Sequence, residues 1–322
     1  MPASRLLFLA LLLFTSPSLL LAQEDEDRPP DLIGLLGPEA GTLQGISAGL
    51  GVVAHRQAAG LQLGLLATVS EGDAYGLNLG GLGMVVDGRA AGINVGGLGM
   101  VVSGGADGIN LGGLGAVADG GMRGVNVGGL GLVADGGLRG INLGGLATVA
   151  EDGILGISAA GLAIVGEHGI TGLSAAGLAI VGEGGVAGVS VAGLAIVGEG
   201  GVRGVNVAGL GIVGDGGVTG VSVAGLGLVA EERMAGVGIS AIHVRSDRIR
   251  GLSVASWVRA DQDLRGLSVA GYNQVRGPQR GLAIGLYNSA DELHGVQVGL
   301  LNRARNNKPP FRWLPLINVH IE

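Results

Sequence analysis

Residues 92–102 read Gly-Ile-Asn-Val-Gly-Gly-Leu-Gly-Met-Val-Val, and residues 76–86 before them read Gly-Leu-Asn-Leu-Gly-Gly-Leu-Gly-Met-Val-Val. The pattern recurs every 16 residues, and its leading glycines are Gly76, Gly92, Gly108, Gly124, Gly140, Gly156, Gly172, Gly188, Gly204 and Gly220. A fixed period of this length is typical of repeat architectures, in which each unit buries its apolar residues only against its neighbours. We number the positions of a unit from 1, at the leading glycine, to 16.

The repeats predict strands. Several glycines in each unit make a helix untenable, because each costs about 1 kcal/mol relative to Ala in a helix interior. The alternation in Gly204-Val205-Asn206-Val207 is typical of a strand. Two all-β architectures fit: a Gly-rich tandem-repeat β-solenoid with about 15–16 residues per coil, and an up-and-down outer-membrane β-barrel with one strand per repeat. In the barrel, Asp135-Gly136-Gly137 would be a hairpin turn.

Three observations favour the solenoid. Val205 and Val207 occupy odd positions of the chain whereas Leu210 and Ile212 occupy even ones, so a corner at Ala208-Gly209 is needed to place all four in one interior. No 32-residue alternation marks the two kinds of turn that a barrel requires. Three Phe, three Tyr and two Trp are too few for two aromatic girdles. We therefore expect a solenoid with these four aliphatic residues in its core.

The chain divides into five segments. Residues 1–22 are expected to be a signal peptide, because a basic start precedes an apolar segment that ends on a small residue. Residues 23–44 form an acidic, Pro-containing linker and N-terminal cap, 45–235 the 16-residue repeat array, 236–308 the 15-residue basic repeats, and 309–322 a closing segment. From residue 236 onward there are 11 basic and 6 acidic residues, whereas the rest of the chain has 8 basic and 20 acidic.

Two columns of polar residues recur in the repeats. Position 3 predicts a structural ladder of side chains hydrogen-bonded between coils, or a polar surface stripe, formed by Asn78, Asn94, Asn110, Asn126, Asn142, Ser158, Ser174, Ser190, Asn206 and Ser222. Position 12 is acidic in nearly every unit. Stacked carboxylates are weak candidates for loose cation binding at Asp87, Asp119, Asp135, Glu151, Glu167, Glu183, Glu199 and Asp215.

No residue set predicts catalysis. Gly45-Ile46-Ser47-Ala48-Gly49 matches the G-x-S-x-G nucleophile pattern, but it is also an ordinary copy of the repeat. The five histidines lack metal-ligand spacing and the chain has no cysteine. We therefore expect no catalytic residue, no cofactor site and no dedicated metal site.

The end of the chain carries a family resemblance. Residues 281–288 read Gly-Leu-Ala-Ile-Gly-Leu-Tyr-Asn, residues 295–302 read Gly-Val-Gln-Val-Gly-Leu-Leu-Asn, and residues 313–318 read Trp-Leu-Pro-Leu-Ile-Asn. These segments resemble the bacterial surface-repeat envelope proteins, whose repeats read G-x-Q-I-G-L-x-N and close on a Leu-Pro-x-Ile-Asn segment. The resemblance is specific over 281–318 and diffuse over 45–280. It implies an exported envelope protein of undefined activity.

These observations together predict an exported, non-enzymatic repeat protein of a bacterial cell envelope, with a structural or adhesive role. We expect it at the cell surface or outer membrane of a Gram-negative bacterium. An outer-membrane β-barrel acting as a pore is the alternative, and an enzyme ranks third. The sequence names no partner. Envelope or host-surface contacts and membrane association are compatible with it, and nucleic-acid binding is not expected.

Overall fold

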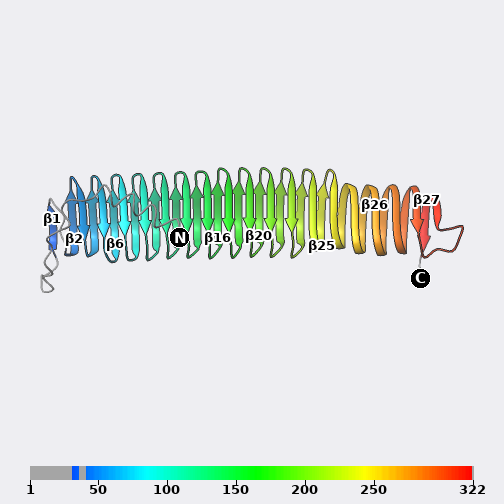
Figure 1. Cartoon of the computed structure of the whole chain (residues 1–322), viewed down its shortest axis with the longest axis horizontal. Coiled ribbons are helices and arrows are strands. Elements are labelled where there is room, and N and C mark those ends of the chain that lie inside the picture. The colour runs from blue at the N-terminus through cyan, green and yellow to red at the C-terminus, as the bar shows by residue number, and fades with distance from the viewer. Residues whose placement is uncertain (1–30, 36–40, 321–322) are drawn as a thin grey trace, which may run out of the picture.

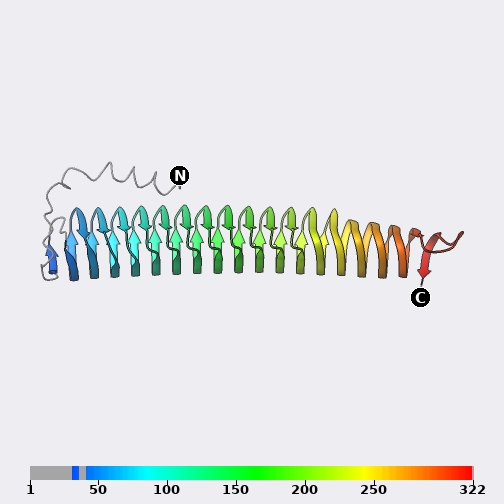
Figure 2. The same cartoon turned by 60° about the horizontal axis from the view of Figure 1, so that its bottom comes forward.

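The chain folds into a straight rod of stacked coils (Figures 1 and 2), seen in a computed structural model that describes residues 31–35 and 41–320. The predicted signal peptide, residues 1–22, and the start of the linker lie outside the described residues. Each coil of the 16-residue array contains one long and one short strand joined by tight corners. The chain is therefore an all-β solenoid, as the repeat predicts.

The strands follow the repeat. The long strands are β2 (Thr42–Gly49), β4 (Gln57–Gly64), β6 (Ala74–Gly80), β8 (Ala90–Gly96), β10 (Ala106–Gly112), β12 (Met122–Gly128), β14 (Leu138–Gly144), β16 (Ile154–Ala160), β18 (Ile170–Ala176), β20 (Val186–Ala192), β22 (Val202–Ala208) and β24 (Val218–Ala224). The short strands are β3 (Val52–His55), β5 (Ala67–Ser70), β7 (Gly83–Val86), β9 (Gly99–Val102), β11 (Gly115–Ala118), β13 (Gly131–Ala134), β15 (Ala147–Ala150), β17 (Ala163–Gly166), β19 (Ala179–Gly182), β21 (Ala195–Gly198) and β23 (Gly211–Gly214). The ends are formed by β1 (Asp31–Leu35), β25 (Gly227–Ser240), β26 (His243–Ala304) and β27 (Trp313–His320).

Neighbouring coils pair in parallel and in register. Strand β10 pairs with β8 and β12, and β11 pairs with β9 and β13, so equivalent positions of successive repeats lie side by side. An up-and-down meander would instead pair consecutive strands antiparallel. The barrel alternative is therefore wrong. The Asp135-Gly136-Gly137 turn joins β13 to β14, and each of these strands pairs with strands one coil away.

Two glycine positions are required by close approach between coils. Gly92, at position 1, has φ +119°, and a Cβ there would overlap the carbonyl oxygen of Gly76 in the preceding coil. Gly97, at position 6, has the same conflict with the carbonyl oxygen of Gly81. The recurrence of glycine at these positions thus follows from the parallel stacking of backbone on backbone.

The interior differs from the sequence-based expectation. Positions 3, 5, 9, 11 and 15 face inward, and Ile212, at position 9, is fully buried. Val205, Val207 and Leu210 were expected beside it but are 40–45% exposed. That expectation was wrong because the strand alternation that places position 3 inside turns Val205 and Val207, at positions 2 and 4, outward, and because Leu210 lies in the corner between β22 and β23.

Side-chain size at positions 11 and 15 of the core is complementary: where one position carries a large residue, the other carries a small one. In the early coils the small Ala90 accompanies the larger Val102, and both are buried. In later coils position 15 is β-branched, as at Ile170, and position 11 becomes glycine. A Cβ on Gly166 would lie only 2.9 Å from Ile170 Cγ1. The interior is therefore close-packed along the rod.

The two ends of the stack differ. Strand β1 pairs in parallel with β2, so the stack begins before residue 45. From β25 into β26 the repeat shortens, and Gly236 pairs with Gly251. Strand β27 then pairs antiparallel with the end of β26 and covers the exposed strand edge of the last coil.

Candidate interaction surface

The predicted Asn/Ser column lies inside the rod. Its members are at most 5% exposed. Side-chain Nδ2 donates to the Oδ1 of the next coil, with each bond 2.8–2.9 Å long, in succession through Asn78, Asn94, Asn110, Asn126 and Asn142. Asn142 Nδ2 then donates to Ser158 Oγ at 3.3 Å. Further along, side-chain atoms of Ser190, Asn206 and Ser222 have no hydrogen-bond partner among the described residues.

A second amide ladder was missed by the sequence analysis. Asn273 Nδ2 donates to Asn288 Oδ1, and Asn288 Nδ2 donates to Asn302 Oδ1, both at 2.7 Å. All three residues are fully buried. The signal was their recurrence at spacings of 15 and 14 residues. The asparagines of the G-L-x-N segments are thus structural residues of the last coils.

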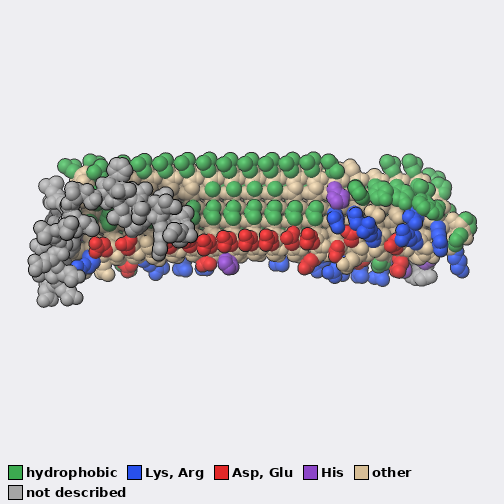
Figure 3. Space-filling view, viewed as in Figure 1, with side chains coloured by type: hydrophobic (Ala, Val, Ile, Leu, Met, Phe, Trp, Pro, Cys, Tyr) green, Lys and Arg blue, Asp and Glu red, His purple; other side chains and the backbone are tan. Residues whose placement is uncertain are grey.

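The charged residues of the 16-residue array share one edge of the rod. Between Gly76 and Ala235, every Asp, Glu, Lys, Arg and His belongs to a five-residue connector at positions 12–16. We call this side the connector edge. Figure 3 shows the acidic row running parallel to rows of hydrophobic side chains. Positions 1–11 are uncharged in all ten repeats of this segment.

The acidic column at position 12 lies along the connector edge. Asp135 is half-buried and the other seven predicted cation candidates are exposed. Burial, and then the charge of Asp135 in the next coil, raise the pKa of the Asp119 carboxyl. Within the described ranges, no group of three or more His, Asp or Glu side chains is arranged to hold a metal ion. The pKa of Asp119 therefore reflects burial first and repulsion from the carboxylate of the next coil second.

The opposite edge of the rod is a continuous column of leucines at position 7. We call it the leucine edge, and its members are Leu82, Leu98, Leu114, Leu130, Leu146, Leu162, Leu178, Leu194, Leu210 and Leu226. Their side chains are 42–52% exposed. The backbone beneath them is paired between coils, as in Leu114 N–H to Leu98 O at 2.6 Å and Gly113 N–H to Gly96 O at 2.9 Å. The edge is thus apolar in its side chains, and its corner N–H groups are paired with the preceding coil.

Both flanks of the leucine edge are aliphatic as well. On the long-strand side, position 2 carries exposed residues such as Ile157 and Leu173, which are 47% and 50% exposed. On the short-strand side, position 10 is a half-buried valine in each of the ten coils, as at Val101 and Val165. Contiguous apolar surface on this scale usually marks an interaction site. The apolar surface therefore wraps around one edge of the rod.

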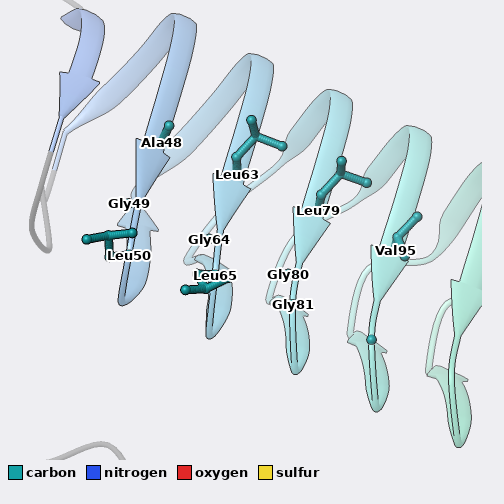
Figure 4. Close-up of a pocket in the computed structure, with 11 residues that line it drawn as sticks. Ala48, Gly49, Leu50, Leu63, Gly64, Leu65, Leu79, Gly80, Gly81 and Val95 are labelled. Carbon is teal, nitrogen blue, oxygen red and sulfur yellow. The ribbon is translucent and has the colours of Figure 1, made fainter.

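At the N-terminal end this surface is hollowed into a groove of about 610 Å³ (Figure 4). The position-4 side chains of Leu63, Leu79 and Val95 form one wall, and Leu50 and Leu65 form the other. Between them the groove is lined by glycines, where the missing side chains leave the backbone open to contact. The groove can therefore accept an apolar chain or side chain.

An aromatic row continues the leucine edge into the C-terminal coils. Ile242 N–H bonds Leu226 O and Trp257 N–H bonds Ile242 O, which extends the backbone ladder of the leucine edge. Ring centroids then follow one another at 5.0–6.2 Å through His243, Trp257, Tyr272, Tyr287 and Trp313. We call these five residues the aromatic row. Its Trp and Tyr side chains combine apolar rings with polar edges.

Arginines flank the aromatic row. The Arg303 guanidinium lies 5.0 Å from the ring centre of Trp313 in a cation–π contact. Asp261 pairs with Arg259 at 2.8 Å, Arg245 at 3.2 Å and Arg276 at 3.5 Å, so one carboxylate faces three cations. Burial acts to raise the pKa of Asp261, but hydrogen bonds and charge from Arg259 and Arg245 outweigh it and lower the pKa. The cluster retains net positive charge.

The G-x-S-x-G segment does not form a nucleophile elbow. Ser47 lies within strand β2 and is 3% exposed, at the position that carries the Asn/Ser column in other coils. A nucleophile elbow instead exposes its serine at a sharp strand-to-helix turn. The motif match is therefore explained by the repeat.

Comparisons with protein-family models, with characterised proteins and with solved structures give no match. In the part of the chain that the structure describes, no helix is long and apolar enough to cross a membrane. The leucine edge, its flanks and the aromatic row are therefore the features from which a function must be argued.

Proposed function

We propose that the protein is an exported, non-enzymatic component of a Gram-negative cell envelope, with a structural or adhesive role at the cell surface or outer membrane. The observation that supports this proposal most is that charged and apolar side chains lie on opposite edges of the rod. Charges are confined to the connector edge, while the leucine edge and its flanks stay apolar over ten repeats. Such a rod binds by extended contact rather than by enclosing a substrate.

Further features support a non-catalytic role. The polar residues in the core bond one another between coils, which is a structural use of their side chains. Ser47, in the motif that most resembles a catalytic one, is buried. The basic start and apolar segment of residues 1–22 and the resemblance of residues 281–318 to surface-repeat proteins support export.

Export and exposure can be tested in one experiment. The full chain is produced in a Gram-negative host, and the cells are fractionated. We expect it in the envelope with Gln23 as its new N-terminus, and we expect protease added to intact cells to degrade it. A Leu12→Arg variant, which interrupts the apolar segment, should stay in the cytoplasm. Cytoplasmic retention of the unaltered chain with residues 1–22 uncleaved would overturn the proposal.

The adhesive role needs a separate readout. Cells carrying the exported chain should attach to an apolar surface more than cells carrying a variant with lysines at Leu146, Leu178 and Leu210 on the leucine edge. Lysines at Leu155, Ala187 and Thr219 on the connector edge add the same charge at the same 32-residue spacing and serve as the control. Equal attachment of both variants would contradict an adhesive use of the leucine edge.

A further inference from the structure

The distribution of apolar surface limits what can cover it. A flat partner, such as a second rod stacked face to face, would cover one side and leave the leucine edge and the opposite flank exposed. The apolar positions lie on both sides of that edge, at position 2 on the long strands and position 10 on the short strands. A fluid apolar phase can instead contact the leucine edge and both of its flanks at once. The connector edge, with the charges of residues 76–235, then remains in water.

The backbone N–H groups at the leucine edge are already paired and tolerate removal from water. Corners usually expose unpaired N–H and C=O groups, and leaving such groups unpaired in a hydrocarbon environment is costly. Here the corner amides bond the preceding coil, as in Leu98 N–H to Leu82 O at 2.6 Å and Gly97 N–H to Gly80 O at 2.9 Å. The corner N–H groups can therefore enter an apolar phase without losing their hydrogen-bond partners.

The C-terminal coils add the chemistry of a lipid headgroup region. The aromatic row continues the leucine edge, and Trp and Tyr are the residues that favour the boundary between hydrocarbon and water. Arg303 and the arginines around Asp261 flank the row. From residue 236 onward basic residues outnumber acidic ones by 11 to 6. Guanidinium groups beside aromatic rings complement anionic phosphate headgroups.

We propose that the rod lies along the surface of an anionic phospholipid bilayer. The leucine edge, its flanks and the aromatic row lie at the boundary between the headgroups and the acyl chains, and the arginines beside the row reach the lipid phosphates. The connector edge points away from the bilayer, so its carboxylates are distant from the lipid phosphates. This inference rests on the proposed function, because the chain must reach the envelope to meet such a surface in the cell.

Flotation of purified protein with lipid vesicles tests the inference independently of export. The full chain is mixed with vesicles of phosphatidylcholine, alone or with phosphatidylglycerol. We expect co-flotation with both, and stronger binding with phosphatidylglycerol that weakens as salt is added. Arg303→Gln should reduce the preference for phosphatidylglycerol. Failure of the unaltered chain to float with either vesicle would overturn the inference while leaving the proposed export untouched.

The matched lysine variants locate the contact. Lysines at Leu146, Leu178 and Leu210 should lower vesicle binding by about tenfold or more, because charged groups must then approach the acyl region. Lysines at Leu155, Ala187 and Thr219 should leave binding unchanged or strengthen it. Circular dichroism of both variants checks that the β-fold is retained. Equal binding by two folded variants would show that the leucine edge does not contact lipid.

A measurement on the unaltered protein avoids any folding question. Trp257 and Trp313 are the two tryptophans of the chain, and both belong to the aromatic row. Vesicles with bromine-labelled acyl chains should quench their fluorescence on binding. Binding without quenching would overturn the placement of the row. The alternative occupant is a second copy of the chain. It would be indicated if the protein binds no vesicles, sediments as a stable dimer without lipid, and loses that dimer in the leucine-edge variant.

Discussion

Replacing one asparagine in the buried ladder tests how much the hydrogen bonds between coils contribute to stability. Asn110 accepts a bond from Asn94 Nδ2 and donates one to Asn126 Oδ1, both 2.8 Å long, and all three side chains are fully buried. Asn110→Ala removes both bonds at once. It leaves a donor on one side and an acceptor on the other without a partner, in an interior that solvent does not reach.

The number of groups left unpaired gives the expected loss of stability in Asn110→Ala. Each buried polar group left unpaired costs about 1–3 kcal/mol, so the two groups together predict a loss of roughly 2–6 kcal/mol in the free energy of unfolding. Ser190 provides the matched control, because it belongs to the same column, is fully buried, and its Oγ has no hydrogen-bond partner in the described part of the chain. Ser190→Ala removes no hydrogen bond, so it should be neutral or slightly stabilising.

Urea denaturation followed by circular dichroism measures both variants, with the slope checked for a single cooperative transition. Hydrogen exchange adds a local readout, since stability in a repeat array is a sum over neighbouring units. We expect lost protection in the coils next to Asn110 and unchanged protection around Ser190. Equal midpoints for the two variants would refute the claim that the ladder stabilises the stack.

Three further predictions concern sterics, burial and pH. Gly97→Ala should cost about 1–3 kcal/mol because its Cβ meets backbone, whereas Gly99→Ala, whose nearest atom is 3.8 Å away, should be tolerated; thermal melts compare the two. Ile212→Asp should destabilise by roughly 3–5 kcal/mol because its charge is buried, whereas Leu210→Asp, at a half-exposed site, should cost about 1 kcal/mol or less in urea titrations. The pKa of Asp119 is raised in the folded state, so ionising its carboxyl destabilises the fold. The contribution of Asp119 to the free energy of unfolding therefore falls as pH rises from the unfolded pKa of 3.8 through the folded one. Asp119→Asn should remove that part of the pH dependence and raise the melting temperature at neutral pH; a lower melting temperature there would indicate that the carboxylate has a stabilising partner.

The sequence by itself determined the period and the chemistry of each position. The 16-residue spacing from Gly76 to Gly220 predicts equivalent units, and once these units are coils of a solenoid their equivalent positions pair in register. The Asn/Ser residues at position 3 recur at the same spacing, so they align once the coils stack. The confinement of charge to positions 12–16 can also be read directly from the chain.

Only the tertiary structure decided which side chains face inward. Aliphatic residues occupy both parities of the strand, so alternation alone cannot distinguish Val205 from Ile212. Position 3 faces inward in every coil that the structure describes, with or without a hydrogen-bonded neighbour, and strand alternation then turns positions 2 and 4 outward. Stacking likewise brings together Trp257, Tyr272 and Tyr287, which are 15 residues apart, because parallel coils place residues one repeat apart beside each other. The apolar surface and its aromatic end are therefore products of the coil geometry.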